Sequence, residues 1–125
     1  MEIKEMQEYI KEFNDEREWS HPRSIKDLML NMNEEIGEFW NIIKWVDTEK
    51  QMQLIKENKS EVENYVGDML YLIFKVAYLC DVDSDKAIKD VMAEYEKRFP
   101  KDKTKGNHAN KLAGGIDLKE EMEEQ

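Results

Sequence analysis

Residues 61–79, EVENYVGDMLYLIFKVAYL, form the most apolar stretch of this 125-residue chain and decide its fold. The stretch contains no proline and is long enough for about five turns of helix. At its start, Ser60 and Glu63 match the S-x-x-E capping box, which predicts that a helix begins near residue 61. The sequence therefore predicts a long central helix that ends near Leu79, ahead of an acidic turn at residues 81–85.

Amphipathic helices are predicted on both sides of this central helix. Apolar residues recur at helical spacing through most of the chain, and the two prolines, Pro22 and Pro100, lie between the periodic segments. No alternating β-branched strands are visible, so the predicted fold class is all-α, a four-to-five-helix antiparallel bundle that self-associates. The predicted helices span, in chain order, residues 3–13, 24–46, 49–57, 61–79 and 85–98.

Composition and charge limit the classes of function that the chain can have. Nineteen basic against 29 acidic residues give a net charge of −10, which argues against a general nucleic-acid binder, because such proteins neutralise phosphates with basic groups. Apolar residues make up 40% of the chain, which predicts only a thin core. Because an interface with a second copy would bury more apolar surface, a homodimer or homotetramer is expected. No signal sequence or membrane-length apolar run is seen, which predicts a cytoplasmic protein without membrane contact. Cys80 is expected to be a small buried apolar residue.

Clustered carboxylates are the first candidates for chemistry. Glu35 and Glu38 lie three apart, so both project from one side of a helix, with Glu34 beside them. Asp68 stands in the apolar central helix, where an aspartate is costly unless it is paired, protonated or bound to metal. The acidic triplet alone is also typical of a solvated helix face. Together with Asp68, it favours a hard divalent cation, typically Mg²⁺.

Two glycines accompany these acids. Gly37 directly precedes Glu38, and Gly67 directly precedes Asp68. Each interior helix glycine costs about 0.5–1 kcal/mol relative to alanine. Their placement predicts either close helix packing or room for a ligand beside the acids.

These residues resemble the MazG-like all-α nucleoside triphosphate pyrophosphohydrolases, whose signature is E-x-x-E on one helix and E-x-x-D on a later one. Residues 35–38, EIGE, match the first half, and Asp68 matches the end of the second. The basic segment 97–106 is similar to the family's segment after the last helix. Residues 16–19, 26–28 and 44–45 are similar to the dCTP pyrophosphatase branch.

The resemblance implies that residues 1–100 are a catalytic domain. After Pro100 the chain turns polar, so a tail, 101–125, is expected to be partly disordered or ordered by ligand. Glu35, Glu38 and Asp68 would hold Mg²⁺ or Mn²⁺ for hydrolysis of a nucleoside triphosphate to the monophosphate and pyrophosphate. Glu34 or Glu35 would accept the proton of the attacking water. The groups expected to neutralise pyrophosphate are Lys97, Arg98, Lys101 and Lys103.

One position departs from the family's pattern. The second motif has a glutamate three residues before its aspartate, where this chain has Tyr65. Asn64 or Glu61, both on the face of Asp68, could assist as metal ligands, or the second metal site could be weakened or lost.

The tryptophans and His21 are candidates for substrate binding. Trp19 and Trp45, both flanked by polar residues, could sandwich a base, whereas Trp40 on the apolar stripe is expected in the core. His21 in the connector is a candidate ligand contact.

The resemblance favours a pyrimidine deoxynucleotide, dCTP or dUTP, and a role in cleaning the nucleotide pool. The alternatives are a catalytically impaired nucleotide-binding sensor, motivated by Tyr65, and a helical interaction module.

Overall fold

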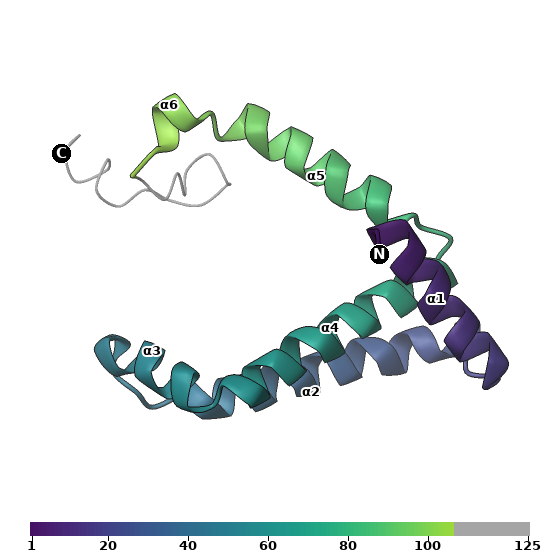
Figure 1. Ribbon diagram of the computed structural model, residues 1–125, viewed down its shortest axis with the longest axis horizontal. Helices are drawn as coiled ribbons and strands as arrows, with labels where there is room; N and C mark the ends of the chain where they lie inside the picture. The colour runs from purple at the N-terminus through teal and green to yellow at the C-terminus, as the bar shows by residue number, and fades with distance from the viewer. Residues whose placement is uncertain (107–125) are drawn as a thin grey trace. The chain divides into compact units, whose positions relative to one another are not determined.

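The computed structural model describes residues 1–106, which form α-helices joined by short turns and contain no β-strand. The all-α fold class predicted from the sequence is confirmed (Figure 1). No helix in this described part is both long and apolar enough to cross a membrane. The elements are α1 (Ile3–Glu16), the 3₁₀ helix η1 (Pro22–Ser24), α2 (Ile25–Ile43), α3 (Thr48–Glu57), α4 (Lys59–Leu79), α5 (Ser84–Arg98) and α6 (Lys101–Thr104).

The chain divides into two compact units, Met1–Ser84 and Asp85–Gln125. The first unit contains α1 to α4. The second begins within the first turn of α5 and includes α6, so this division lies earlier than the one predicted at residue 100. Most of the predicted tail, residues 107–125, lies outside the described residues.

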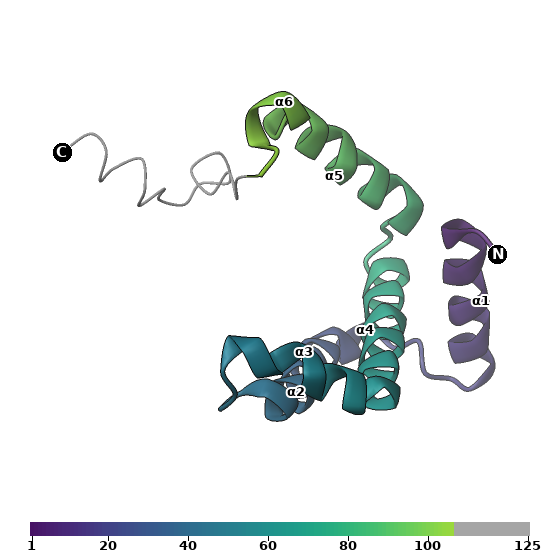
Figure 2. The ribbon, with the colours of Figure 1, turned by 60° about the vertical axis from the view of Figure 1, so that its left-hand side comes forward.

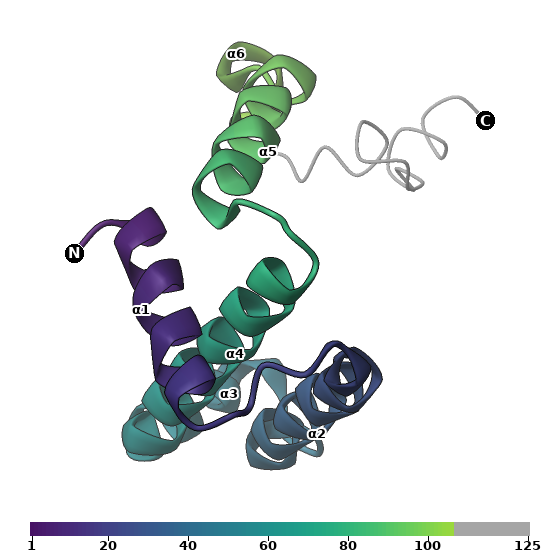
Figure 3. The same ribbon diagram turned by 90° about the vertical axis from the view of Figure 1, so that its right-hand side faces the viewer.

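Helix α4 is central to the first unit, as its apolar sequence predicts. It packs against both α1 and α2 (Figures 2 and 3). Helix α3 connects the C-terminal end of α2 to the N-terminal end of α4. The ring of Phe39 on α2 lies 5.0 Å from that of Tyr65 on α4. Because Glu35 also interacts with Asp68, the two helices run antiparallel, with residue numbers rising on one as they fall on the other.

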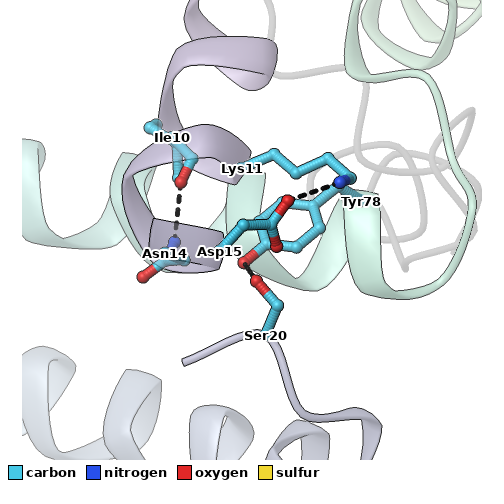
Figure 4. Close-up of polar contacts among 6 residues, drawn as sticks. All are labelled: Ile10, Lys11, Asn14, Asp15, Ser20 and Tyr78. Carbon is cyan, nitrogen blue, oxygen red and sulfur yellow. Dashed lines mark hydrogen bonds and ion pairs between the residues drawn. The ribbon is translucent and has the colours of Figure 1, made fainter. Parts of the chain in front are cut away.

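Polar contacts link α1 and the connector that follows it to α4. Asn14, which is completely buried, donates from Nδ2 to the carbonyl of Ile10 at 2.9 Å, and its Oδ1 accepts from the Tyr71 hydroxyl at 2.6 Å. Beside it, the Ser20 and Tyr78 hydroxyls lie 2.8 Å apart (Figure 4). A Lys11–Asp15 ion pair of 2.6 Å lies over the same region and lowers the pKa of Asp15. These contacts fix the position of α1 on the central helix.

The apolar core of the described residues is small, as the composition predicts. Its buried members are Ile10, Leu28, Leu72 and Ala77. Trp40 is 55% exposed, so its predicted place in the core is wrong. The apolar stripe of α2 is wider than the strip that α4 covers: Phe39 faces Tyr65, and the adjacent Trp40 remains outside this contact.

Two details of α4 differ from the sequence expectation. The helix begins at Lys59, with Asn58 as N-cap, so Ser60 lies inside the first turn and does not form the predicted capping box. Asn58 also ends α3, so one residue serves both helices. Cys80 is exposed rather than buried, because it is the C-cap at which the chain turns away through Asp81.

Lys75 is the buried charge of this unit. It is 8% exposed on α4, and no hydrogen bond or ion pair reaches it from residues 1–106. Burial lowers its pKa below the ordinary 10.5, because removal from water disfavours the ammonium form. An unpaired buried charge opposes folding.

Lys75→Met is therefore expected to stabilise the protein by about 1–2 kcal/mol at pH 7. The penalty is present below the lowered pKa and disappears as the pH rises toward 10.5, so the gain should shrink at alkaline pH. Thermal unfolding at pH 7 and pH 10 measures both effects. The exposed Lys56→Met is the control and should change little. A less stable Lys75→Met protein would show that the ammonium makes a contact needed for folding.

Candidate functional site

Glu35 is the centre of the candidate site. Helix α2 presents Glu35 and Glu38 one turn apart, as their spacing predicts. The pKa of Glu35 is raised first by burial and then by the charges of Glu38 and Asp68, with smaller contributions from a hydrogen bond to Glu38 and from Glu34. The Glu35 Oε2 atom is buried, and within residues 1–106 it has no hydrogen-bond partner. This carboxyl group therefore lies in a negative environment that favours its protonated form or a positive ligand.

Asp68 reaches this environment from α4. It is partly buried, and its Oδ2 accepts a hydrogen bond of 2.9 Å from Nδ2 of Asn64, one turn earlier on the same helix. The structure thus brings together three of the predicted acids, Glu35, Glu38 and Asp68. It also places Asn64 beside Asp68, where the helical spacing predicts it.

Next to the acids, α2 and the first half of α4 enclose an open pocket of about 630 Å³. Tyr65 packs against Phe39 in its wall. The predicted site residues Glu38, Glu61 and Asn64 also line it. Sequence reasoning missed the remaining lining residues, although several lie one helical turn from Glu38 or Glu61 and the period of 3.6 could have found them. Those residues are Phe39, Asn41, Ile42, Asn58 and Ser60.

The glycines beside the acids do not serve close packing within this chain. A Cβ atom added to Gly37 or Gly67 would meet nothing within 4 Å. Of the two readings left open by the sequence, close helix packing is therefore wrong here. Open space lies at the Cβ positions of Gly37 and Gly67, the residues that precede Glu38 and Asp68.

The donors fit a hard divalent cation in their chemistry. Carboxylate and amide oxygens are the ligands that Mg²⁺ prefers, and the buried Oε2 of Glu35 is an acceptor without a partner among the described residues. In this same part of the chain, no group of three or more His, Cys, Asp or Glu side chains is arranged to hold a metal ion. The residue types therefore fit a divalent cation, although their side chains are not arranged around one point in this structure.

The two candidate base-stacking tryptophans lie apart. Trp45 follows α2 and is 87% exposed, lining a separate hollow with residues of α3. Trp19 precedes α2 and packs edge-on against Phe13 at 6.2 Å. The 19 residues of α2 between them span about 28 Å. A single chain therefore cannot sandwich one base between both indoles, and the predicted sandwich would need indoles from two copies of the chain.

His21 has a structural contact in the connector. Its Nδ1 accepts a hydrogen bond of 3.1 Å from the backbone N–H of Arg23, and its carbonyl accepts from the Ser24 hydroxyl. These bonds cap η1, which explains a polar residue before Pro22 without a ligand.

The predicted basic residues belong to the second unit. Lys97 and Arg98 end α5, and Lys101 and Lys103 lie in α6. Arg98 lies 3.9 Å from Glu94 of its own helix. All four are exposed cations near the end of the described chain.

The comparisons with known proteins add one finding. No protein-family model matches the chain, and no curated protein sequence is significantly similar to it. The structure is similar to the crystal structure of a pyrophosphatase from Archaeoglobus fulgidus, with a TM-score of 0.64 over 77% of this chain and 90% of that one. The two sequences are 24% identical over this match. The likeness confirms the all-α fold and shows that the fold is one found in a pyrophosphatase.

Proposed function

We propose that this protein hydrolyses nucleoside triphosphates to the monophosphate and pyrophosphate with bound Mg²⁺ or Mn²⁺. The carrying observation is Glu35, a partly buried carboxyl group whose pKa is raised beside Glu38 and Asp68. Repelling carboxylates gathered next to an open pocket support a divalent cation and an anionic substrate. The fold shared with a pyrophosphatase supports the release of pyrophosphate.

Each acid then has a role. Glu35, Glu38 and Asp68 would hold the cation, and Asn64 keeps the Asp68 carboxylate in place through its 2.9 Å hydrogen bond. When bound, the cation would supply charge neutralisation and acidification of a water molecule. Glu34 or Glu35 accepts the proton as the water oxygen bonds to the α-phosphorus and the bond to the β-phosphate breaks. The groups proposed to neutralise pyrophosphate, as the resemblance implies, are Lys97, Arg98, Lys101 and Lys103.

Self-association is part of this proposal. Large apolar side chains on α2 and α4 remain about half exposed in the single chain, an arrangement that a second copy would cover. They are Met29, Leu30, Ile36, Trp40, Val66, Leu70 and Ile73. A homodimer or homotetramer in light scattering is the expected result, and a monomer would contradict it.

A nucleotide-binding sensor is the second candidate. Tyr65 stands where the resembling family has a metal-binding glutamate, and it packs against Phe39 instead of offering a carboxylate. Such a protein would bind nucleotide and Mg²⁺ but turn over slowly.

The expected result of a nucleotide screen is Mg²⁺-dependent formation of pyrophosphate and monophosphate in equal amounts. We expect a pyrimidine deoxynucleotide, dCTP or dUTP, to be preferred, consistent with a role in cleaning the nucleotide pool. Removal of the cation with EDTA should abolish the reaction, and added Mg²⁺ or Mn²⁺ should restore it. Thermal stabilisation by nucleotide without pyrophosphate would favour the sensor. If the protein shows neither pyrophosphate release nor stabilisation by nucleotide, both functions are contradicted.

A further inference from the structure

The pocket beside the acids has an aromatic wall built from two helices. The rings of Phe39 on α2 and Tyr65 on α4 are 5.0 Å apart and tilted by 46°. Both line the open space of about 630 Å³, which is within the usual range for small-molecule sites. Aromatic side chains at such a surface favour a flat, unsaturated ligand, because stacking needs only a π-face.

The polar rim of the pocket offers several free hydrogen-bond acceptors, beside Asn41 and Ser60, which can both donate and accept. Asn58 donates from Nδ2 to the carbonyl of Leu54 at 2.8 Å, and Asn64 donates from Nδ2 to Asp68 at 2.9 Å. Because a carbonyl and a carboxylate can only accept, these bonds fix both amide orientations. The two Oδ1 atoms are the remaining acceptors of these amides, and within residues 1–106 they receive no hydrogen bond.

Charge adds to this acceptor character. Glu38 and Glu61 contribute carboxylates, which accept hydrogen bonds when ionised. No Lys, Arg or His is among the described residues that line the pocket. The two carboxylates therefore favour N–H groups of a ligand over carbonyl oxygens.

We propose that this pocket takes the nucleobase of the substrate, stacked on Tyr65, and that Glu61 selects bases carrying an exocyclic amino group. The inference rests on the proposed function and assigns the base to a place other than the tryptophans. Cytosine and adenine present an amino group where uracil and hypoxanthine present a carbonyl oxygen. A carboxylate at that edge accepts a hydrogen bond from the amino group of cytosine or adenine. With uracil or hypoxanthine, it faces the lone pairs of a carbonyl oxygen instead.

Matched nucleotide pairs test the selection. The ratio of kcat/KM for dCTP over dUTP, and for dATP over dITP, is expected to be about tenfold or more. Glu61→Gln should reduce both ratios to below about threefold, because an amide can rotate to donate to the carbonyl oxygen. Ratios near one in the native protein, or ratios unchanged by Glu61→Gln, would overturn the role of Glu61.

Three further variants test the stacking. Tyr65→Leu is expected to raise KM about tenfold for every nucleotide while kcat changes less than about threefold, since stacking tolerates any base. Tyr65→Phe keeps a ring and should behave like the native protein. Trp45→Ala should leave KM unchanged, because Trp45 lines a different hollow. A raised KM in Trp45→Ala with a normal KM in Tyr65→Leu would place the base at the tryptophan instead.

Binding of the products separates this inference from the proposed hydrolysis. Calorimetry with dCMP and dUMP in the presence of Mg²⁺ needs no turnover. Preferential dCMP binding that weakens in Tyr65→Leu would support the pocket even if no triphosphate were hydrolysed, and would then contradict the hydrolysis alone. Hydrolysis with neither base preference nor sensitivity to Tyr65→Leu would contradict the pocket alone. Circular dichroism of each variant verifies that its helices are intact.

Discussion

Replacing Glu38 or Asp68 with alanine is expected to lower pyrophosphate release by about a thousandfold, which corresponds to about 4 kcal/mol of transition-state stabilisation. Each substitution removes one of the three acids proposed to hold the cation. The fold should be retained, and the metal-free protein should be as stable as the native one or more stable, because both charges raise the pKa of Glu35 by repulsion. Pyrophosphate release and thermal unfolding, each with and without Mg²⁺, measure the two effects.

Glu63→Ala is the matched control for these variants. Glu63 lies on α4 as Asp68 does, but it is exposed and its neighbour is Lys59, 3.9 Å away, rather than the other acids. It should retain activity and the stabilisation by Mg²⁺. Near-normal turnover in Glu38→Ala would show that the metal assignment is wrong.

Asn14→Leu is expected to destabilise the protein by about 2 kcal/mol. The substitution leaves the part-buried Tyr71 hydroxyl without its acceptor, which costs about 1–3 kcal/mol, and removes the additional side-chain donor to the Ile10 carbonyl. Asn14 is completely buried, so water cannot replace it without rearrangement. Urea denaturation followed by circular dichroism gives the change in unfolding free energy.

Tyr71→Phe is the partner variant in a double-mutant cycle. Alone, it removes only the hydroxyl group that bonds to Asn14 and should cost about 1 kcal/mol. In the Asn14→Leu background it should cost nothing, or even stabilise, because the hydroxyl no longer has its acceptor. Additive effects of the two substitutions would contradict the direct bond as the link between α1 and α4.

The proposed catalytic acids show how local and long-range information combine. Because an α-helix repeats every 3.6 residues, the adjacency of Glu35 with Glu38, and of Asn64 with Asp68, follows from their spacing alone. That Asp68 faces Glu35 required the antiparallel pairing of α2 with α4, which depends on contacts between residues 26 to 33 positions apart. The resemblance to a known family supplied that expectation, whereas periodicity could not.

The base site shows the limit of sequence reasoning. Trp19 and Trp45 are candidates because polar residues flank them, but α2, about 28 Å long, lies between them in one chain. The sequence singles out Tyr65 only as a departure from the family's metal motif, and only the packing of two helices joins its ring and that of Phe39 into a pocket wall.

The sequence by itself determined the all-α class, the approximate helix ranges and the acids that share a helix face, because these depend on contacts within a few residues. Only the tertiary structure decided which apolar faces are covered, leaving Trp40 and Cys80 exposed and Lys75 buried. Only the tertiary structure shows the hydrogen bond between Asn14 and Tyr71 and the pocket beside Glu38. The physical reason is that a hydrophobic pattern identifies an apolar face, whereas the helix that covers it is chosen by packing between distant segments.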